Sequence, residues 1–313
     1  MMPYQARSLG AYVELAHLIS YQLAAKHLRL EKNQRALNQL SGGYRTHIRG
    51  RGIDFNEVRQ YQAGDDIRSI DWRVSARSGK TYVKQFYEER EKNVLIAVDQ
   101  RQTQFFGSTL ALKSVLAADI AAYIAWAAHH KGDRVGGLIF NDHTHIDCRP
   151  QRLKKSVLQF LQHLHNFNHQ LTSFAPHPTR AFSDVLQELK RVSKPGSQIF
   201  LISDFHDVDH QCTALLRDLS QHNEIIALQT FDPMEMELPP AGTYCASSGS
   251  KRYRFDTSNN ATRQRYTADF MEARAQLRTL MGQYNISLIP VSTQESPLTT
   301  LQTYLGQPMR HAI

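Results

Sequence analysis

Five apolar runs, separated by segments of helical length, constrain the fold of this chain more than any other feature. The runs occupy residues 93–99, 133–141, 197–205, 224–232 and 286–292. They are rich in Ile, Val and Leu without polar alternation, which is typical of strands buried on both faces. Helices are predicted between them, at 110–130, 151–165, 182–192, 212–222 and 263–284. Strands alternating with helices predict an α/β fold with a mostly parallel sheet covered on both faces.

Asn93–Val98 is expected to be a central strand, with Val135–Phe140 and Ile199–Ile202 beside it, because all three share this buried composition. A short partner strand is predicted near His145–Cys148. Residues 239–260, rich in Pro, Gly and Ser, are expected to form an irregular insertion. These elements together predict one α/β domain over residues 93–313.

Residues 1–92 are predicted to form a separate N-terminal part. Apolar side chains recur at spacings of three and four from residue 8 to residue 40, which predicts a helix that ends at Gly42-Gly43. Residues 45–91 follow as shorter, partly β pieces, with turns at 63–66 and 78–80 and a strand at 82–87. Charges of both signs are interleaved here with apolar residues, so this segment has enough apolar surface to be ordered.

The motif RGRGIDFNEVRQYQAGDDIRSIDWRVSAR, residues 49–77, precedes an apolar strand that ends in Asp99. This arrangement resembles the signature of the bacterial "domain of unknown function 58" family. The resemblance implies a von Willebrand factor A-like (vWA) domain with a Rossmann-type sheet, often encoded beside a MoxR-type AAA+ ATPase. The signature positions are Arg59, Tyr61, Gly64, Asp65, Asp66, Arg68, Asp71, Trp72, Arg73 and Arg77.

Asp99 and Asp204 follow two of the predicted strands. Ligands of open parallel sheets bind at this end of the strands, where the strand order reverses. The family resemblance implies that a metal-ion-dependent adhesion site would lie here, holding Mg²⁺ with Asp99, Thr103, Asp204 and a loop threonine, for which Thr179 is the candidate. Arg101 replaces the first serine of that motif. A guanidinium is a donor only, so it cannot ligate a cation.

We interpret these positions as a degenerate metal site in which Arg101 neutralises the two aspartates. If a metal binds at all, we expect Mg²⁺ at Asp99, Thr103 and Asp204. A plainer alternative is that the two aspartates only cap the helices that follow them. An enzymatic alternative is a phosphatase-like reaction at Asp99, but Arg101 stands where the second, acidic Asp of that pattern belongs. We therefore expect no catalytic residue and no cofactor.

Bulk properties narrow the function further. The formal net charge of +8 favours acidic partners, but Lys and Arg are mixed with Asp and Glu, whereas nucleic-acid binders usually concentrate positive charge on one face. The longest apolar run, 116–128, is too short to span a bilayer. The three cysteines lack metal-finger spacing. We expect a cytoplasmic protein that neither enters the membrane nor binds nucleic acid.

The resemblance favours a non-enzymatic protein-interaction module that works with a MoxR-type ATPase in the chaperone-like maturation or remodelling of an unidentified client protein. The alternatives are a metal-dependent binding protein or enzyme at Asp99 and Asp204, and a nucleic-acid binder. Two roles remain open for the signature. It stabilises the fold, with Asp65 or Asp66 capping the next element and Trp72 packed on the vWA domain, or its arginines form a docking face.

Overall fold

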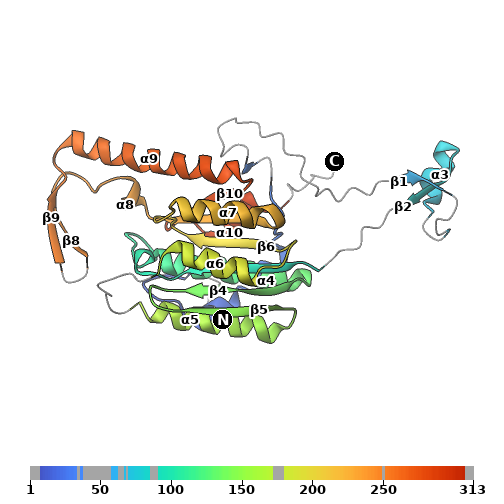
Figure 1. Ribbon diagram of the computed structural model, residues 1–313, viewed down its shortest axis with the longest axis horizontal. Coiled ribbons are helices and arrows are strands. Elements are labelled where there is room, and N and C mark those ends of the chain that lie inside the picture. Colours follow the sequence, from blue (N-terminus) through green and yellow to red (C-terminus); the bar gives the residue numbers. More distant parts are fainter. Residues whose placement is uncertain are drawn as a thin grey trace. The chain divides into compact units, whose positions relative to one another are not determined.

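The computed structural model describes residues 8–33, 36–37, 58–62, 67, 70–84, 91–171, 180–248 and 251–306 (Figure 1). The chain forms two compact units, one of residues 1–43 with 92–313 and one of residues 44–91. The sequence predicts instead that residues 1–92 stand apart from the α/β domain. That division is wrong for residues 8–33, because Val13, Leu18 and Tyr21 are fully buried in the core of the larger unit.

A six-stranded sheet forms the centre of the larger unit, in the order β10-β7-β6-β3-β4-β5. The strands are β3 Asn93–Asp99, β4 Arg134–Phe140, β5 His145–Gln151, β6 Gln198–Ser203, β7 Glu224–Phe231 and β10 Ser287–Ser292. All neighbours are parallel except β5, which runs antiparallel to β4. Strand β3 lies between β4 and β6, as predicted. The order reverses between β3 and β6, as in doubly wound α/β sheets.

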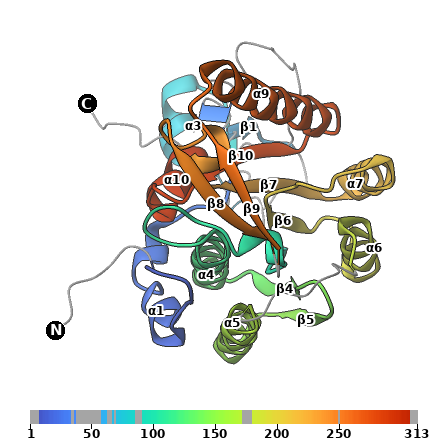
Figure 2. The same cartoon turned by 90° about the vertical axis from the view of Figure 1, so that its left-hand side faces the viewer.

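Helices cover both faces of this sheet (Figure 2). Alternate residues of β3 point to opposite faces, so that Val94, Ile96 and Val98 belong to one core and Leu95 and Ala97 to the other. The first core is closed by α1 Leu15–Ser20, α4 Lys113–Lys131, α5 Lys154–His169 and α10 Pro297–Tyr304, and the second by α6 Phe182–Val192 and α7 His210–His222. The predicted α/β fold is therefore confirmed.

The N-terminal segment is not the long helix that its periodicity predicts. Within residues 8–33 it forms the short helix α1 and the 3-10 helix η1, Ala24–His27, with turns and irregular backbone around them. Ser8 donates to both carboxylate oxygens of Asp119, and Trp126 Nε1 donates to the carbonyl of Leu18 at 3.0 Å. The apolar residues of the segment thus cover the outer side of α4, and this tertiary contact outweighs helical propensity.

Residues 239–260 are more regular than predicted. They contain a hairpin of β8, Thr243–Ser248, and β9, Lys251–Asp256, which follows the short helix α8, Pro233–Met236. Helix α9 spans Asn260–Gln283, but among its residues only Met281 is buried. The expected amphipathic helix is therefore largely solvent-exposed.

The smaller unit contains β1, Val58–Gln60, paired antiparallel with β2, Tyr82–Lys84, and the helix α3, Trp72–Ser78. Gly79 ends α3 with a φ of +67°, which confirms the turn predicted at residues 78–80. The predicted turn at 63–66 and Gly42-Gly43 lie outside the described residues. Among the helices that the structure describes, none has the length and apolar character needed to cross a membrane.

Candidate functional site

Four carboxylates gather at the edge of the sheet where the parallel strands end. Asp99 ends β3, and Asp142, Asp204 and Asp232 follow β4, β6 and β7. The reversal of strand order between β3 and β6 places Asp99 and Asp204 at the position where α/β sheets bind their ligands. The contacts of these carboxylates decide what the edge can bind.

Arg101 occupies the space between Asp99 and Asp207. Its Nε and Nη2 donate to Asp99 at 3.0 and 2.8 Å, and its Nη1 and Nη2 donate to Asp207 at 2.6 and 2.9 Å. Its guanidinium carbon lies 5.6 Å from the ring centroids of both Phe140 and Phe182. The predicted contact between Arg101 and Asp99 is confirmed. The prediction that Arg101 also neutralises Asp204 is wrong, because the second carboxylate partner of Arg101 is Asp207 and Asp204 pairs with Lys113.

Burial and pairing set the electrostatics of this group. Asp99 is 0% exposed, and it also accepts a hydrogen bond from Ser203 Oγ at 2.7 Å. Burial raises the pKa of the Asp99 carboxyl, and the Arg101 guanidinium opposes that shift. Burial lowers the pKa of Arg101, but Asp99 and Asp207 outweigh it, so the net shift is upward. Arg101 is therefore a permanent cation with its donors directed at carboxylates.

Lys113, the first residue of α4, pairs with the other strand-end carboxylate. Its Nζ lies 3.0 Å from Asp204 and 2.6 Å from Glu235, and Lys113 is 1% exposed. Burial lowers the pKa of Lys113, but Asp204 and Glu235 outweigh burial, so the net shift of this pKa is upward. Sequence reasoning missed this residue. The available signal was a lysine at the start of an otherwise apolar helical run, KSVLAADIAAYIAW.

A strained turn follows β6. Phe205 has a φ of +56°, a left-handed conformation that costs a residue with a side chain about 1–2 kcal/mol. The ring of Phe205 is buried against Phe182. The turn reverses the chain between Asp204, which contacts Lys113, and Asp207, which contacts Arg101. The strained residue, Phe205, therefore lies in the chain between the carboxylate that pairs with Lys113 and the carboxylate that pairs with Arg101.

The loop from Gln100 to Leu112 is held by the remaining carboxylates. Asp142 accepts from the backbone N–H of Gln102 at 2.7 Å. Asp232 accepts from the backbone N–H of Ser108 at 2.8 Å, from the Ser108 hydroxyl, and from Thr293 Oγ1 at 2.6 Å. The loop after β3 is thus fastened to the ends of the neighbouring strands.

Neither aspartate caps a helix, contrary to the plainer alternative. The N-cap side chain of α7 is Asp209, which accepts from Cys212 N at 2.7 Å, and α4 begins after Leu112 without a side-chain cap. Asp99 and Asp204 instead accept from cationic side chains.

The arrangement does not fit a divalent metal. Thr103 is exposed on the 3-10 turn η3, Gln102–Gln104, whereas Asp99 is completely buried and both of its oxygens accept from Arg101. Thr179 lies outside the described residues. No group of three or more His, Cys, Asp or Glu suited to a metal ion occurs in the described part of the chain. Asp99 and Asp204 are each satisfied by a side-chain cation in place of an ion.

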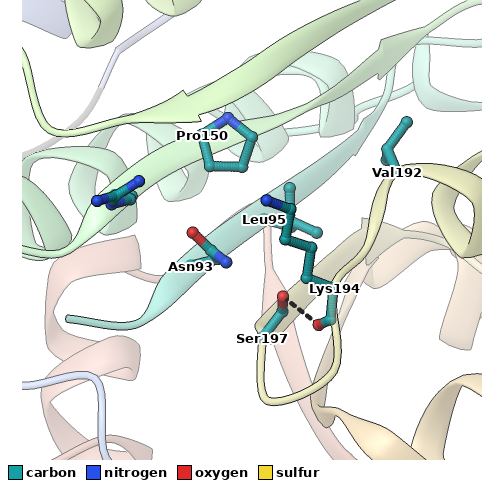
Figure 3. A pocket seen from close by; sticks show the side chains of 7 residues that line it. Asn93, Leu95, Pro150, Val192, Lys194 and Ser197 are labelled. Carbon is teal, nitrogen blue, oxygen red and sulfur yellow. Dashed lines mark hydrogen bonds between the residues drawn. The ribbon is translucent and has the colours of Figure 1, made fainter. Parts of the chain in front are cut away.

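A small cavity lies at the opposite end of the sheet, near the start of β3 (Figure 3). Its volume is about 60 Å³, and it is lined by Asn93, Leu95, Arg134, Pro150, Val192, Lys194 and Ser197. A space of this size holds a few water molecules. Ser197 Oγ donates to the carbonyl of Lys194 at its rim, at 2.6 Å, so this hydroxyl already has an acceptor.

The signature residues lie in the smaller unit. Asp71 caps α3 by accepting from the backbone N–H groups of Arg73 and Val74 at 3.1 and 3.2 Å. The cap predicted at Asp65 or Asp66 falls on residues outside the described part of the chain. Trp72 is 68% exposed, so it is not a core residue of its own unit. Arg73 and Arg77 are also exposed. Tyr61 is half-buried and donates its N–H to the carbonyl of Thr81.

Other signature positions cannot be compared in this way. Arg59 lies in β1, paired with Val83. Gly64, Asp65, Asp66 and Arg68 lie outside the described residues.

Comparison with known proteins gives matches in sequence and in structure. The model of the family "Protein of unknown function DUF58" matches residues 57–276. Uncharacterized proteins Mb1516 of Mycobacterium bovis and Rv1480 of Mycobacterium tuberculosis are each 30% identical over 224 residues, covering 70% of this chain and 68% of theirs.

Two solved structures resemble the chain at lower similarity. One is the conserved hypothetical protein BatB from Bacteroides thetaiotaomicron, with 14% identity and a TM-score of 0.43 over 68% of this chain and 96% of that one. The other is an aerotolerance-related membrane protein from Bacteroides fragilis, with 15% identity and a TM-score of 0.39 over 68% and 98%.

Proposed function

The chain belongs to the DUF58 family of proteins of unknown function, and on that premise we propose that it is a non-enzymatic protein-interaction module. It would act with a MoxR-type AAA+ ATPase in the chaperone-like maturation or remodelling of a client protein. The ATPase partner is an expectation from the resemblance of residues 49–77. The interaction role rests on the chemistry at the carboxyl edge of the sheet.

The observation that carries the proposal is the pairing of Asp99 with Arg101 and of Asp204 with Lys113. In this fold that position normally receives a ligand or an ion. Here two single positive charges replace the charge that a divalent cation would supply. Both are almost completely buried, so Asp99 and Asp204 are each paired with a cation inside the protein and are closed to an outside ion.

The same pairing argues against a phosphatase-like enzyme. A nucleophilic aspartate needs an accessible oxygen and a neighbouring acid or base. Both oxygens of Asp99 accept hydrogen bonds from Arg101, and Ser203 donates to Oδ2 as well. The Arg101 guanidinium cannot transfer a proton at working pH, so the residue that stands in the place of the acid cannot act as one.

A rigid sheet edge of this kind suits a protein that holds its partners in a fixed arrangement. The loop after β3 is fastened by Asp142 and Asp232 as well as by the two ion pairs, so a partner bound on it meets a fixed surface. The three cysteines are free thiols, which supports a reducing compartment, and we propose the cytoplasm.

The test uses the purified full chain with a purified MoxR-type ATPase from the same genome. Sedimentation velocity with a non-hydrolysable ATP analogue, with ADP and without nucleotide should show a complex whose stability depends on the nucleotide. The ATPase rate should also change when the chain is added. Absence of a complex in all three states would refute the proposal.

The enzymatic alternative is tested in parallel by the hydrolysis of p-nitrophenyl phosphate with Mg²⁺. Activity that disappears in Asp99→Asn while the protein stays folded would replace the proposal by the enzymatic reading.

A further inference from the structure

The hairpin β8–β9 and the first half of α9 extend away from the sheet. Figure 1 shows the hairpin beyond the carboxyl ends of the strands, and Figure 2, viewed from that side, shows it in front of those ends. We call the described residues 243–248, 251–256 and 260–271 the arm. An exposed two-stranded hairpin is marginal by itself in water, so its composition is informative.

The base of the arm is firmly built. Thr257 is 0% exposed, and its hydroxyl donates to the carbonyls of Pro240 and Gly242 at 2.7 and 3.0 Å. Arg263 of α9 donates to the carbonyl of Thr257 at 2.8 Å. Asn259 caps α9 by accepting from Ala261 N and Thr262 N. These bonds join the hairpin to the helix at a defined point.

The two faces of the hairpin differ in chemistry. In the observed register Tyr244 lies opposite Phe255, and their rings stack with centroids 6.0 Å apart. Alternation along β9 places Arg252 and Arg254 on the other face, opposite Ser247 and Cys245. The hairpin therefore has one aromatic face, which stabilises it, and one arginine face.

The arm is strongly basic. It contains Lys251, Arg252, Arg254, Arg263 and Arg265 against Asp256 and Asp269, a net charge of +3 within a chain of net charge +8. Arg252 and Arg254 are exposed and have no ion-pair partner among the residues that the structure describes. Two arginines on one face that form no ion pair within the described residues are suited to carboxylates of another molecule.

We infer that the arginine face of the arm is a docking site for an acidic surface of a partner protein. Arginine is favoured at the energetic centres of protein interfaces.

A protein fits the arm better than a single-stranded nucleic acid. Nucleic-acid grooves bring aromatic rings and basic side chains together, so that bases stack while phosphates are neutralised. On the hairpin these groups occupy opposite faces. Asp256 and Asp269 also interrupt the positive charge, whereas nucleic-acid binders concentrate it in one stripe.

The inference deepens the proposed function and rests on it for the identity of the partner. The test compares the wild-type chain with Arg252→Glu/Arg254→Glu. The matched control is Arg191→Glu/Arg217→Glu, which reverses two exposed charges on α6 and α7. All three proteins should melt at nearly the same temperature, since none of these side chains is buried.

Binding of the MoxR-type ATPase is measured by biolayer interferometry at physiological salt. We expect the arm variant to bind at least about tenfold more weakly than wild type, with the control close to wild type. If the arm variant binds as tightly as wild type, the docking site is refuted and the proposed function stands.

If the ATPase does not bind the wild-type chain, the proposed function fails and a second probe decides on the arm. Fluorescence anisotropy with labelled poly-L-glutamate should show binding that the arm variant loses and the control keeps. Equal binding by all three proteins refutes the arm as an acidic-protein site. Arm-dependent binding of an oligo-dT probe that exceeds binding of poly-L-glutamate also refutes it, in favour of nucleic acid.

Discussion

Replacing Arg101 by methionine should destabilise the larger unit strongly, because it leaves Asp99 buried without its cation. Removing one partner of a buried ion pair typically costs about 3–5 kcal/mol. The second contact, to Asp207, adds at most about 1 kcal/mol, because the Asp207 side chain is 36% exposed. The hydroxyl of Ser203 still donates to Asp99, which offsets part of the loss. We therefore expect a loss of about 4 kcal/mol at pH 7.

The assay is urea unfolding followed by tryptophan fluorescence. The chain has two tryptophans, and Trp126 is fully buried in α4 while Trp72 lies in the smaller unit. A Trp72→Phe background makes Trp126 the reporter of the larger unit. Arg217→Met, at an exposed ion pair on α7, is the control and should change the unfolding free energy by less than about 0.5 kcal/mol.

A double-mutant cycle identifies the source of the loss. Asp99→Asn removes the unpaired charge, so Arg101→Met/Asp99→Asn should be more stable than Arg101→Met alone. A loss in Arg101→Met no larger than in Arg217→Met would refute the reasoning, as would a double variant no more stable than the single one.

Three further results are expected. Burial raises the pKa of the Asp232 carboxyl, but hydrogen bonds from Ser108 and Thr293 outweigh burial and hold this pKa below its usual range. The contribution of Asp232 to the free energy of unfolding is therefore complete above about pH 4 and is lost as the pH falls through the folded pKa. Asp232→Asn should therefore flatten the acid limb of a pH series of urea midpoints, and an unchanged limb would contradict this. Asp71→Ala should lower the free energy of unfolding by about 0.5–2 kcal/mol, because it removes the cap of α3, and Trp72→Ala should lower it by less, because Trp72 is exposed. If thermal melting shows a larger loss for Trp72→Ala, Trp72 is a core residue and the reasoning is wrong. Gly137→Ala would put a methyl group 2.1 Å from the carbonyl oxygen of Ile96 and should cost at least about 2 kcal/mol, whereas Gly282→Ala in α9 meets no atom and should be neutral or stabilising in the same melts.

The sheet could be predicted because its signal is local. Each buried strand corresponds to a short apolar run in the sequence, and helices between these runs predict a parallel arrangement. The contact of Arg101 with Asp99 was predictable for the same reason, since the two residues are only two positions apart.

The rest of the site depends on contacts that are distant in sequence. Lys113 meets Asp204 across 91 residues and Glu235 across 122, and Glu235 is placed by the capping box of α8. No spacing rule connects these positions. The prediction for the N-terminal segment was wrong for a different reason. Its apolar residues at spacings of three and four cover α4 from two short helical pieces and irregular backbone, not from one long helix.

The claim that Arg101 and Lys113 take the place of a metal ion at the carboxyl ends of the strands is tested most directly by calorimetric titration of the purified chain with Mn²⁺ and Mg²⁺. The account predicts no binding to the wild-type protein up to millimolar metal. Arg101→Ser should gain measurable affinity, because two carboxylates then face each other without a guanidinium between them. Micromolar binding of Mn²⁺ to the wild-type chain that is lost in Asp99→Ala would contradict this claim, because the metal would then bind Asp99 in the presence of Arg101.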